Sequence, residues 1–171
     1  RHLRAAERLL QVVPNPNLRA TALAKQARVH VVATLLGRAK SLPAALRLAA
    51  GAIEAAPAAG APQVEADARS TLGLARALAG QVDEGVAEIE GAIERLEEIG
   101  SALGAAAARR DLGLASARSG PDWDDRTEGA FTASARAFDS AGAPLARAWT
   151  ELAYARFLAD VGFLHGAAAT D

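Results

Sequence analysis

The sequence of 171 residues contains no cysteine and no methionine, and aromatic residues make up only 4% of it. Without cysteine the chain has no disulfide framework, no thiolate metal site and no thiol nucleophile, which is compatible with a reducing compartment. Apolar residues make up 51% of the chain, and the excess is alanine. We therefore expect an interior of closely approaching helices and not a core of large rings.

Strong net charge and long apolar runs are also missing. The formal net charge is −1, so we expect no direct binding to nucleic acid. No run approaches the roughly 18 apolar residues of a membrane span, and no apolar segment follows the start at Arg1-His2-Leu3-Arg4. These features predict a cytoplasmic chain with no membrane partner. The absence of an initiator methionine predicts a fragment of a longer protein.

The sequence repeats with a period of 40 residues. Leu72-Gly73, Leu112-Gly113 and Leu152-Ala153 are each 40 residues apart, and Val32-Ala33 lies one period earlier. An alanine precedes each of the three leucines by four residues and another follows it by three; these alanines are Ala68, Ala108 and Ala148, then Ala75, Ala115 and Ala155. A fixed period of this size indicates a solenoid, in which each unit buries its apolar face by stacking on its neighbours.

Glycine and proline divide the chain into segments with helical periodicity and no strand-like alternation. We expect an all-α fold of seven to nine helices in antiparallel hairpins with a right-handed superhelical drift. The repeat units are residues 1–17, 18–62, 63–100, 101–142 and 143–171, the first partial and the last truncated. The expected helices are a stretch ending at Val13, then Leu18–Lys40, a helix capped by Ser41 and ending near Ala56, Gln63–Ala79, Asp83–Gly100, Ala102–Arg118, Arg126–Ala141 and Leu145–Val161.

Several single residues are expected to begin or end these helices. Asn17, Asp83 and either Asp124 or Asp125 are predicted caps at helix N-termini. Gly100 is predicted to lie just beyond a helix C-terminus, where glycine tolerates a left-handed backbone. Gly162 is expected to end the last helix, with Phe163-Leu164-His165-Gly166 opening a returning one.

The second helices of the hairpins also align. Placing Gly100 over Gly142 sets Ile89 over Phe131, and apolar residues stay apolar or small along the pair. We interpret Ile89, Phe131 and Trp149 as packing residues. The glycine of each Leu-Gly pair is expected to permit close approach within its hairpin, so that leucine at Gly113 would overpack it.

These residues resemble the tetratricopeptide repeat. A 34-residue unit laid on Ala66–Ile99 puts Leu72 and Gly73 at the family's Leu-Gly positions, with the turn Gly80-Gln81-Val82-Asp83-Glu84-Gly85 between the helices. The chain departs from the family in its period, in Arg76 and Arg156 at the usual tyrosine position and in Glu97 at the closing proline. It looks most like the divergent repeats of MalT-like, LuxR-type ATP-binding transcriptional regulators and of AAA-containing adenylate cyclases.

Candidate catalytic features are weak. His2, His30 and His165 lie far apart, without a partner at helical metal-pair spacing, and Asp122-Trp123-Asp124-Asp125 lacks the later glycine and glutamate of a calcium loop. Gly100-Ser101-Ala102-Leu103-Gly104 has no phosphate-loop lysine. We expect no enzyme activity, no metal and no cofactor.

The favoured function is a non-catalytic block that binds protein or peptide, or relays a signal to other domains of a larger bacterial regulator. The alternative is a repeat domain that binds a small effector. Residues expected to line a concave groove are Leu74, Arg110, Leu114, Arg147, Tyr154 and Phe157. Tyr154 and Phe157 equally fit an interface with a missing helix, which predicts self-association through an exposed C-terminal face that includes Phe163 and Leu164.

Overall fold

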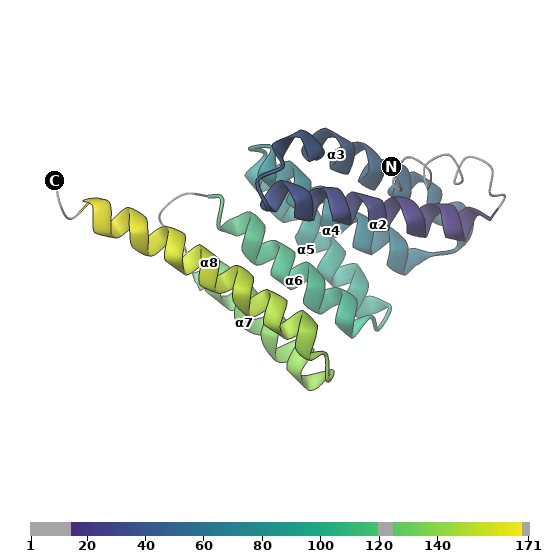
Figure 1. The fold of residues 1–171 in the computed structure, drawn as a ribbon. Helices are drawn as coiled ribbons and strands as arrows, with labels where there is room; N and C mark the ends of the chain where they lie inside the picture. The colour runs from purple at the N-terminus through teal and green to yellow at the C-terminus, as the bar shows by residue number, and fades with distance from the viewer. Residues whose placement is uncertain (1–14, 120–124, 169–171) are drawn as a thin grey trace.

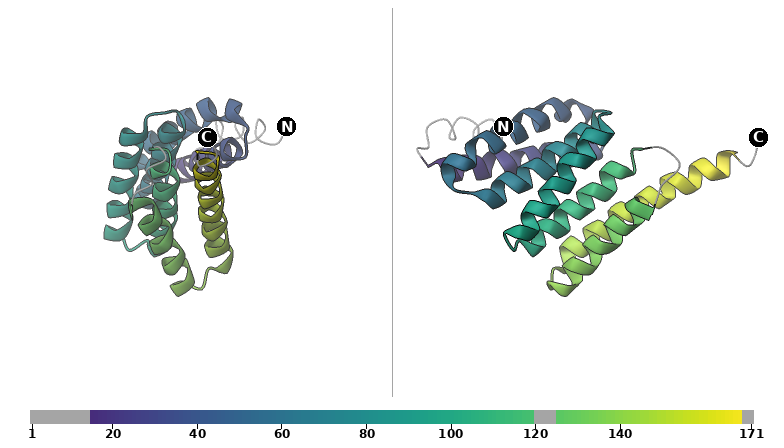
Figure 2. Two further views of the ribbon diagram at one scale, coloured as in Figure 1. Left: turned by 90° about the vertical axis from the view of Figure 1, so that its left-hand side faces the viewer. Right: turned by 180° about the vertical axis from the view of Figure 1, so that it is seen from behind.

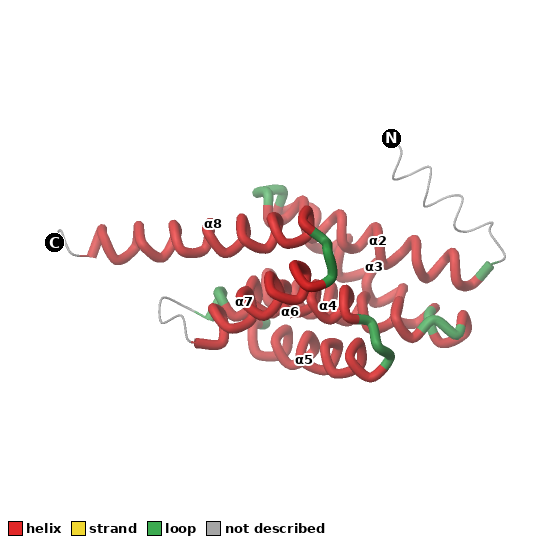
Figure 3. Tube along the Cα trace, turned by 90° about the horizontal axis from the view of Figure 1, so that it is seen from below, coloured by secondary structure: helices red, strands yellow, loops and turns green. Residues whose placement is uncertain are grey.

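The computed structural model describes residues 15–119 and 125–168. Within these ranges every regular element is helical and none is a strand (Figure 3), so the all-α prediction is confirmed. Seven α-helices are described, with short 3-10 turns at Ala39–Ser41 and Pro57–Ala59. The α-helices are α2 (Pro16–Leu35), α3 (Leu42–Ala55), α4 (Pro62–Leu78), α5 (Val82–Glu98), α6 (Ala102–Ser116), α7 (Asp125–Ser140) and α8 (Pro144–Ala168).

Successive helices pack against one another as hairpins (Figure 1). α2 packs on α3, α4 on α5 and α6 on α7, while contacts from α3 to α4 and from α5 to α6 join one hairpin to the next. The first helices α2, α4, α6 and α8 also contact one another in that order, as the views in Figure 2 allow the reader to follow. The helices that carry Leu72, Leu112 and Leu152 are therefore successive neighbours in one layer, as the repeat predicts.

Most helix boundaries lie within a few residues of those expected, but α2 ends at Leu35 and not near Lys40, and three of the predicted caps are wrong. The side chain of Asn15, not Asn17, caps α2, and its Oδ1 accepts hydrogen bonds from the backbone N–H groups of Asn17 and Leu18 at 3.0 and 3.2 Å. Ser41 ends a 3-10 turn and makes no capping hydrogen bond. Asp83 lies inside the first turn of α5, where its charge favours the helix N-terminus without capping it.

The end of the last helix also differs from the prediction. α8 continues through Gly162 to Ala168, so Gly162 does not end it and Phe163–Gly166 do not open a returning helix. Glycine inside a helix costs only about 1 kcal/mol, and Val161, Phe163 and Leu164 on either side of Gly162 are compatible with helix. The predicted exposure of Phe163 and Leu164 concerns side chains outside the described part of the structure.

Two other predictions fall on residues outside the described ranges. These are the amphipathic stretch ending at Val13 and the acidic turn through Asp124. Asp125 is the first residue of α7 and therefore lies within the helix and not before it.

One apolar core runs through the hairpins from α2 to α6. Its buried members come from five helices and are mostly alanine with a few branched side chains: Val31, Ala45, Ala66, Leu74, Ala75, Ala77, Val86, Ile89, Leu96, Ala105, Ala108 and Ala115. Small side chains at the contacts allow helix axes to approach closely, as the alanine-rich composition predicts. No described helix is both long enough and apolar enough to cross a bilayer.

The glycines of the Leu-Gly pairs lie where helices cross most closely. A Cβ atom added to Gly73 would lie 2.5 Å from the carbonyl oxygen of Gly85 and 2.7 Å from Cγ1 of Ile89. A Cβ atom at Gly113 would lie 2.9 Å from the ring of Phe131. Ile89 and Phe131 are the two residues that the alignment of second helices superimposes, so the same contact recurs in both hairpins. The predicted packing role of Gly73 and Gly113 is confirmed.

Replacing Gly73 with alanine should lower the free energy of unfolding by about 1–3 kcal/mol, because the new methyl group meets a backbone carbonyl that cannot move without shifting α5. Gly113→Ala should have a smaller effect of the same sign, since a ring can yield. The matched control is Gly91→Ala in α5, which meets no atom within 4 Å and should stabilise by about 0.5–1 kcal/mol. Urea unfolding of the three variants measures the difference, and equal effects at Gly73 and Gly91 would contradict the close crossing.

Candidate functional site

A buried carboxylate joins the three first helices α2, α4 and α6. Asp111 of α6 is only 1% exposed. Its Oδ2 accepts a hydrogen bond of 2.8 Å from the hydroxyl of Ser70 on α4 and lies 2.6 Å from Nη1 of Arg28 on α2. A carboxylate buried this deeply requires such partners, because the cost of removing it from water is otherwise several kcal/mol. Asp111 therefore fixes the spacing of α2, α4 and α6 through polar contacts.

Arg110, the neighbour of Asp111 in sequence, is held in the same region. Its Nη2 lies 3.6 Å from Oδ1 of Asp111, and its side chain is largely buried. Burial lowers the pKa of the Arg110 guanidinium, although the nearby Asp111 charge opposes this effect. Among the described residues, neither Nε of Arg110 nor Oδ1 of Asp111 has a hydrogen-bond partner. Nε of Arg110 is thus a buried donor without an acceptor, and Oδ1 of Asp111 has the long ion pair to Arg110 but no hydrogen bond.

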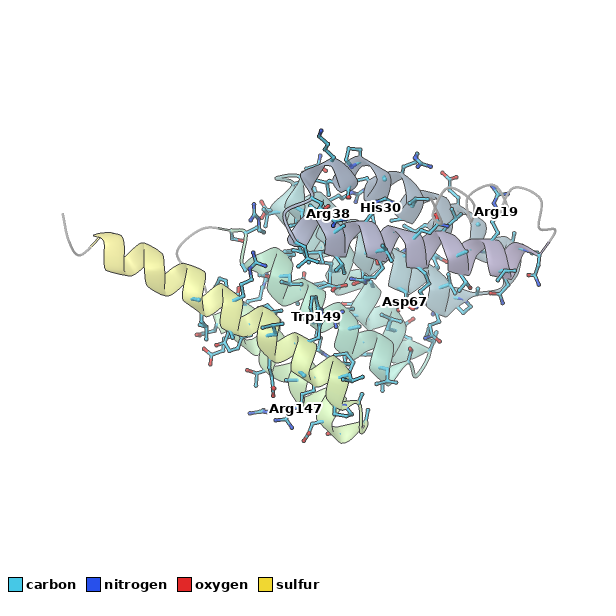
Figure 4. The ribbon with its side chains drawn as sticks, viewed as in Figure 1. Arg19, His30, Arg38, Asp67, Arg147 and Trp149 are labelled. Atoms are coloured by element: carbon cyan, nitrogen blue, oxygen red, sulfur yellow. The ribbon has the colours of Figure 1, made fainter. Side chains whose placement is uncertain are left out.

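Asp67 of α4 adds a second carboxylate beside this group. Burial raises its pKa above the ordinary value of 3.8, the charges of Lys25 and Arg28 lower it, and the charge of Asp111 raises it further. Figure 4 shows Asp67 in the middle of the molecule, on the helix between α2 and α6. We call Lys25, Arg28, Asp67, Ser70, Arg110 and Asp111 the three-helix polar cluster.

The three-helix polar cluster has the chemistry of recognition through hydrogen bonds and charge. It contains three cationic and two anionic side chains and one hydroxyl, all contributed by the layer of first helices. No group of three or more His, Cys, Asp or Glu side chains able to hold a metal ion occurs among the residues that the structure describes. The part-buried His30 lies on α2, and the described contact at this residue is the hydrogen bond of 2.9 Å that its carbonyl oxygen accepts from Thr34.

A shallow open groove lies between α4 and α5, with a volume of about 660 Å³. Arg69 spans it, donating to Glu65 on its own helix and to Glu88 on α5 at 3.0 Å, and Glu88 also accepts from Arg76 at 2.9 Å. The hydrogen bonds that Arg69 donates to Glu88 and Glu65 raise the pKa of its guanidinium. The charged side chains along this groove are therefore paired with one another.

The residues predicted to line one concave groove do not come together. Leu74 is fully buried in the core, so its assignment to the groove is wrong: it packs between helices and has no accessible surface. Leu114 is half-buried against the same core. Arg110 belongs to the three-helix polar cluster, where it meets Asp111 of its own chain.

The three remaining predicted residues lie on α8. Arg147 is exposed and binds Glu151 at 2.7 Å and Asp139 at 2.5 Å. Tyr154 stacks on Phe131 of α7 with ring centroids 5.2 Å apart, and Phe157 is half-buried. Tyr154 was expected either to line a groove or to fill an interface with a missing helix, whereas in the structure it packs on Phe131 of α7.

The exposed apolar surface of α8 lies on other residues than the sequence predicts. Leu145 is 87% exposed, Trp149 38% and Leu152 61%, and these three recur at i, i+4 and i+7 on one side of the helix. Ile89, Phe131 and Trp149 were all expected to pack in the interior. Ile89 and Phe131 are buried, whereas Trp149, labelled in Figure 4, is exposed. Leu152 occupies the repeat position at which Leu72 is only 9% exposed. The repeat alone therefore failed to predict this surface.

Comparison with known proteins yields no relative: no family model matches the chain, and no curated protein matches it. The internal repeat and the side chains that the described fold brings together are therefore the features that bear on function.

Replacing Asp111 with alanine should destabilise the chain by about 3 kcal/mol, because Arg28 and the largely buried Arg110 lose their carboxylate. Ser70→Ala, which removes one hydrogen bond to a charged acceptor, should cost about 1.5–3 kcal/mol. The control is Arg95→Ala. Arg95 and its partner Glu98 are both exposed, so the loss of this ion pair should change stability by less than about 1 kcal/mol. Chemical denaturation provides all three values. An Asp111→Ala variant with an unchanged free energy of unfolding would show that the carboxylate does not connect the helices.

The raised pKa of Asp67 predicts a pH-dependent stability. A carboxyl group whose pKa is higher in the folded state than in the unfolded state stabilises the fold at low pH, and this contribution is lost as pH rises through the folded value. Asp67→Asn should therefore be more stable than the parent chain at pH 7, with the difference shrinking as pH falls toward 3.8. Urea midpoints across this range test it against Glu94→Gln, an exposed control in the interior of α5; a gap that widens on acidification would contradict the sign.

Proposed function

We propose that the chain is a tetratricopeptide-like α-solenoid segment that binds a protein or peptide, or relays a signal between domains, within a larger bacterial regulatory protein of the MalT-like, LuxR-type class. The proposal includes a right-handed superhelix, a cytoplasmic location and no catalytic role. The observation that carries it is the recurrence of one packing contact in two successive hairpins, in which Gly73 meets Ile89 and Gly113 meets Phe131. Repeated hairpins of this kind characteristically form extended binding surfaces.

The three-helix polar cluster supports recognition as the role of this surface. Its side chains come from three successive first helices, which is how stacked repeats assemble a binding face from equivalent helices. Lys25 is exposed while Asp67 is partly buried, so the cluster extends from the interior to the surface. A peptide segment carrying both a carboxylate and a hydrogen-bond donor matches the mixed charge of the cluster.

A small polar effector is the second candidate, and one specific observation favours it. Nε of Arg110 and Oδ1 of Asp111 are buried and have no hydrogen-bond partner among the described residues. A small molecule that supplies an acceptor to the first and a donor to the second would satisfy both groups. The groove between α4 and α5 is a separate place on the surface. Its open shape favours an extended peptide there over a small polar molecule.

Selection of a random 12-residue peptide library on the chain tests the first candidate. We expect selected peptides to bind with micromolar Kd and to lose at least tenfold in affinity on Lys25→Glu, because Lys25 forms the exposed edge of the three-helix polar cluster. The control is Lys40→Glu, which makes the same charge change at an exposed residue of the 3-10 turn that follows α2. Peptides that respond equally to both variants would contradict recognition at this cluster. A thermal shift produced by small polar molecules and abolished by Arg110→Leu would instead favour the effector.

A further inference from the structure

Helices α4 and α6, the first helices of the hairpins α4–α5 and α6–α7, each pack against their neighbours through two faces. The backward face packs on the preceding hairpin: in α4, Ala68 belongs to an apolar cluster with Ala24 and Ala52. Leu72 belongs to another, with Ala27, Leu48 and Ala49. The forward face packs on the following second helix through Gly73 in α4 and Gly113 in α6. The backward face consists of Ala68, Leu72 and Ala75 in α4, of Ala108, Leu112 and Ala115 in α6, and of Ala148, Leu152 and Ala155 in α8.

In α8 the backward face is exposed, and the forward face packs on the preceding helix α7. The backward residues Ala148, Leu152 and Ala155 are all exposed, although their counterparts in α4 and α6 are buried or, at Leu112, half-buried. The forward side of α8 instead packs on α7: Thr150 is fully buried with its hydroxyl 3.4 Å from that of Ser134, and Tyr154 stacks on Phe131. The two faces lie roughly half a turn apart on a helix of about 3.6 residues per turn. α8 is therefore rolled about its axis by that amount relative to α4 and α6.

The composition of the two faces explains the roll. The forward side of α8 carries Tyr154 and Phe157, whereas the backward face carries one leucine and two alanines. Burying an aromatic ring against Phe131 yields more apolar contact than burying alanine. In α4 and α6 this choice does not arise, because a second helix covers the forward face. α8 has two apolar sides, and the described helices cover only one of them.

We propose that the forward face of α8 is a docking site for an amphipathic helix, and that this helix turns α8 back to the register of α4 and α6. The proposal rests on the proposed function and specifies its partner. In the bound state the partner helix covers Ala153, Tyr154 and Phe157, and the backward face packs on α6 and α7. The partner gains affinity only from the turned register, so its binding shifts the population toward that register.

The internal repeat specifies the chemistry of the partner helix. Ile89 and Phe131 occupy the slots opposite Gly73 and Gly113, so a large aliphatic or aromatic side chain is expected opposite Ala153. A small residue follows three positions later in both second helices, as Ala92 and Ser134. The charge pattern adds a further requirement. Arg76 binds Glu88, the residue before Ile89, and the exposed Arg156 holds the repeat position of Arg76, so an acidic residue should precede the large apolar one.

Helix α5 meets these requirements and provides the probe. We would label a synthetic peptide of residues 82–98 and staple it between positions 87 and 91, which are exposed in α5 and lie one helical turn apart, away from Ile89. Stapling is needed because an isolated helix of this length is marginally stable in water. Fluorescence anisotropy with the whole 171-residue chain should show saturable binding, weakened at least tenfold by Ile89→Ser in the peptide.

A charge exchange tests the orientation of the bound peptide. Arg156→Glu in the chain should weaken the parent peptide at least threefold, and Glu88→Lys in the peptide should restore binding to that variant. Arg136→Glu is the matched control, since Arg136 is an exposed arginine on α7. Equal loss in both variants, or no rescue by Glu88→Lys, would overturn the assigned contact.

A disulfide tests the turn of α8. The chain has no cysteine, so Ser134→Cys combined with Thr150→Cys gives a single pair, at positions whose hydroxyl oxygens are 3.4 Å apart. Oxidation should lock α8 in the described register and weaken the peptide at least tenfold relative to the reduced form, whereas Thr150→Cys alone should not respond to oxidant. Separately, maleimide labelling of Ala155→Cys should slow at least fivefold when the peptide binds, while Glu94→Cys on α5 stays reactive.

The outcomes separate this proposal from its competitors. If the oxidised double-cysteine variant binds the peptide as tightly as the reduced form, the proposed rotation of α8 is wrong. The peptide would then be placed on the exposed side of α8 that carries Leu145, Trp149 and Leu152. Binding without protection of Ala155→Cys would mean that the peptide replaces α5 or α7. Self-association abolished by Leu152→Glu would assign the backward face to a second copy. Absence of binding would overturn the proposal, while leaving the result at Lys25 as an independent test of the proposed function.

Discussion

The distance of closest approach between paired helices controls this fold. At Gly73 and Gly85 the two backbones are so close that a methyl group on either would lie 2.5 Å from the carbonyl oxygen of the other. Such a crossing orients the hairpin, because helices in contact through their backbones cannot slide as helices separated by flexible side chains can. It also explains the shortage of large side chains. The core from α2 to α6 is lined mostly by alanine, and its larger members fill the space beside the crossings.

Tight crossings organise each hairpin, but polar contacts connect the first helices across hairpins. Asp111 of α6 accepts from Ser70 of α4 and pairs with Arg28 of α2, so three helices share one carboxylate. Apolar contacts between alanine-rich faces are weakly directional, whereas a buried carboxylate accepts only donors placed at specific angles. The same polar residues then become the groups available for recognition. If the proposed recognition uses Asp111 and Arg110, the same side chains serve both the packing of the helices and the binding of a partner.

The sequence predicted the helices and their pairing well, because these depend on local signals. Glycine and proline punctuation located the helices within a few residues, and the spacing of Leu-Gly pairs predicted both the layer of first helices and the contact of Gly113 with the second helix. It could not predict the three-helix polar cluster. Arg28, Ser70 and Asp111 do not recur at the repeat spacing, and their association arises only when three hairpins stack. Leu74 was misplaced because the repeat gives the helix on which a residue lies but not which neighbour covers it.

The same distinction explains α8, where the repeat predicts the residues of each face but not which face is buried. Repeat position is a property of sequence, whereas burial depends on what packs beside the helix. With α7 alone as its main neighbour, α8 buries Tyr154 against Phe131 and leaves Leu152 in solvent. Adding a helix to the forward side would make the opposite choice favourable, since both apolar sides would then be covered. Under the proposed docking, occupancy of the forward side would be transmitted as rotation of α8, which contacts α7 through Ser134 and Phe131. Such a relay would require no change within the tight glycine crossings of the inner hairpins.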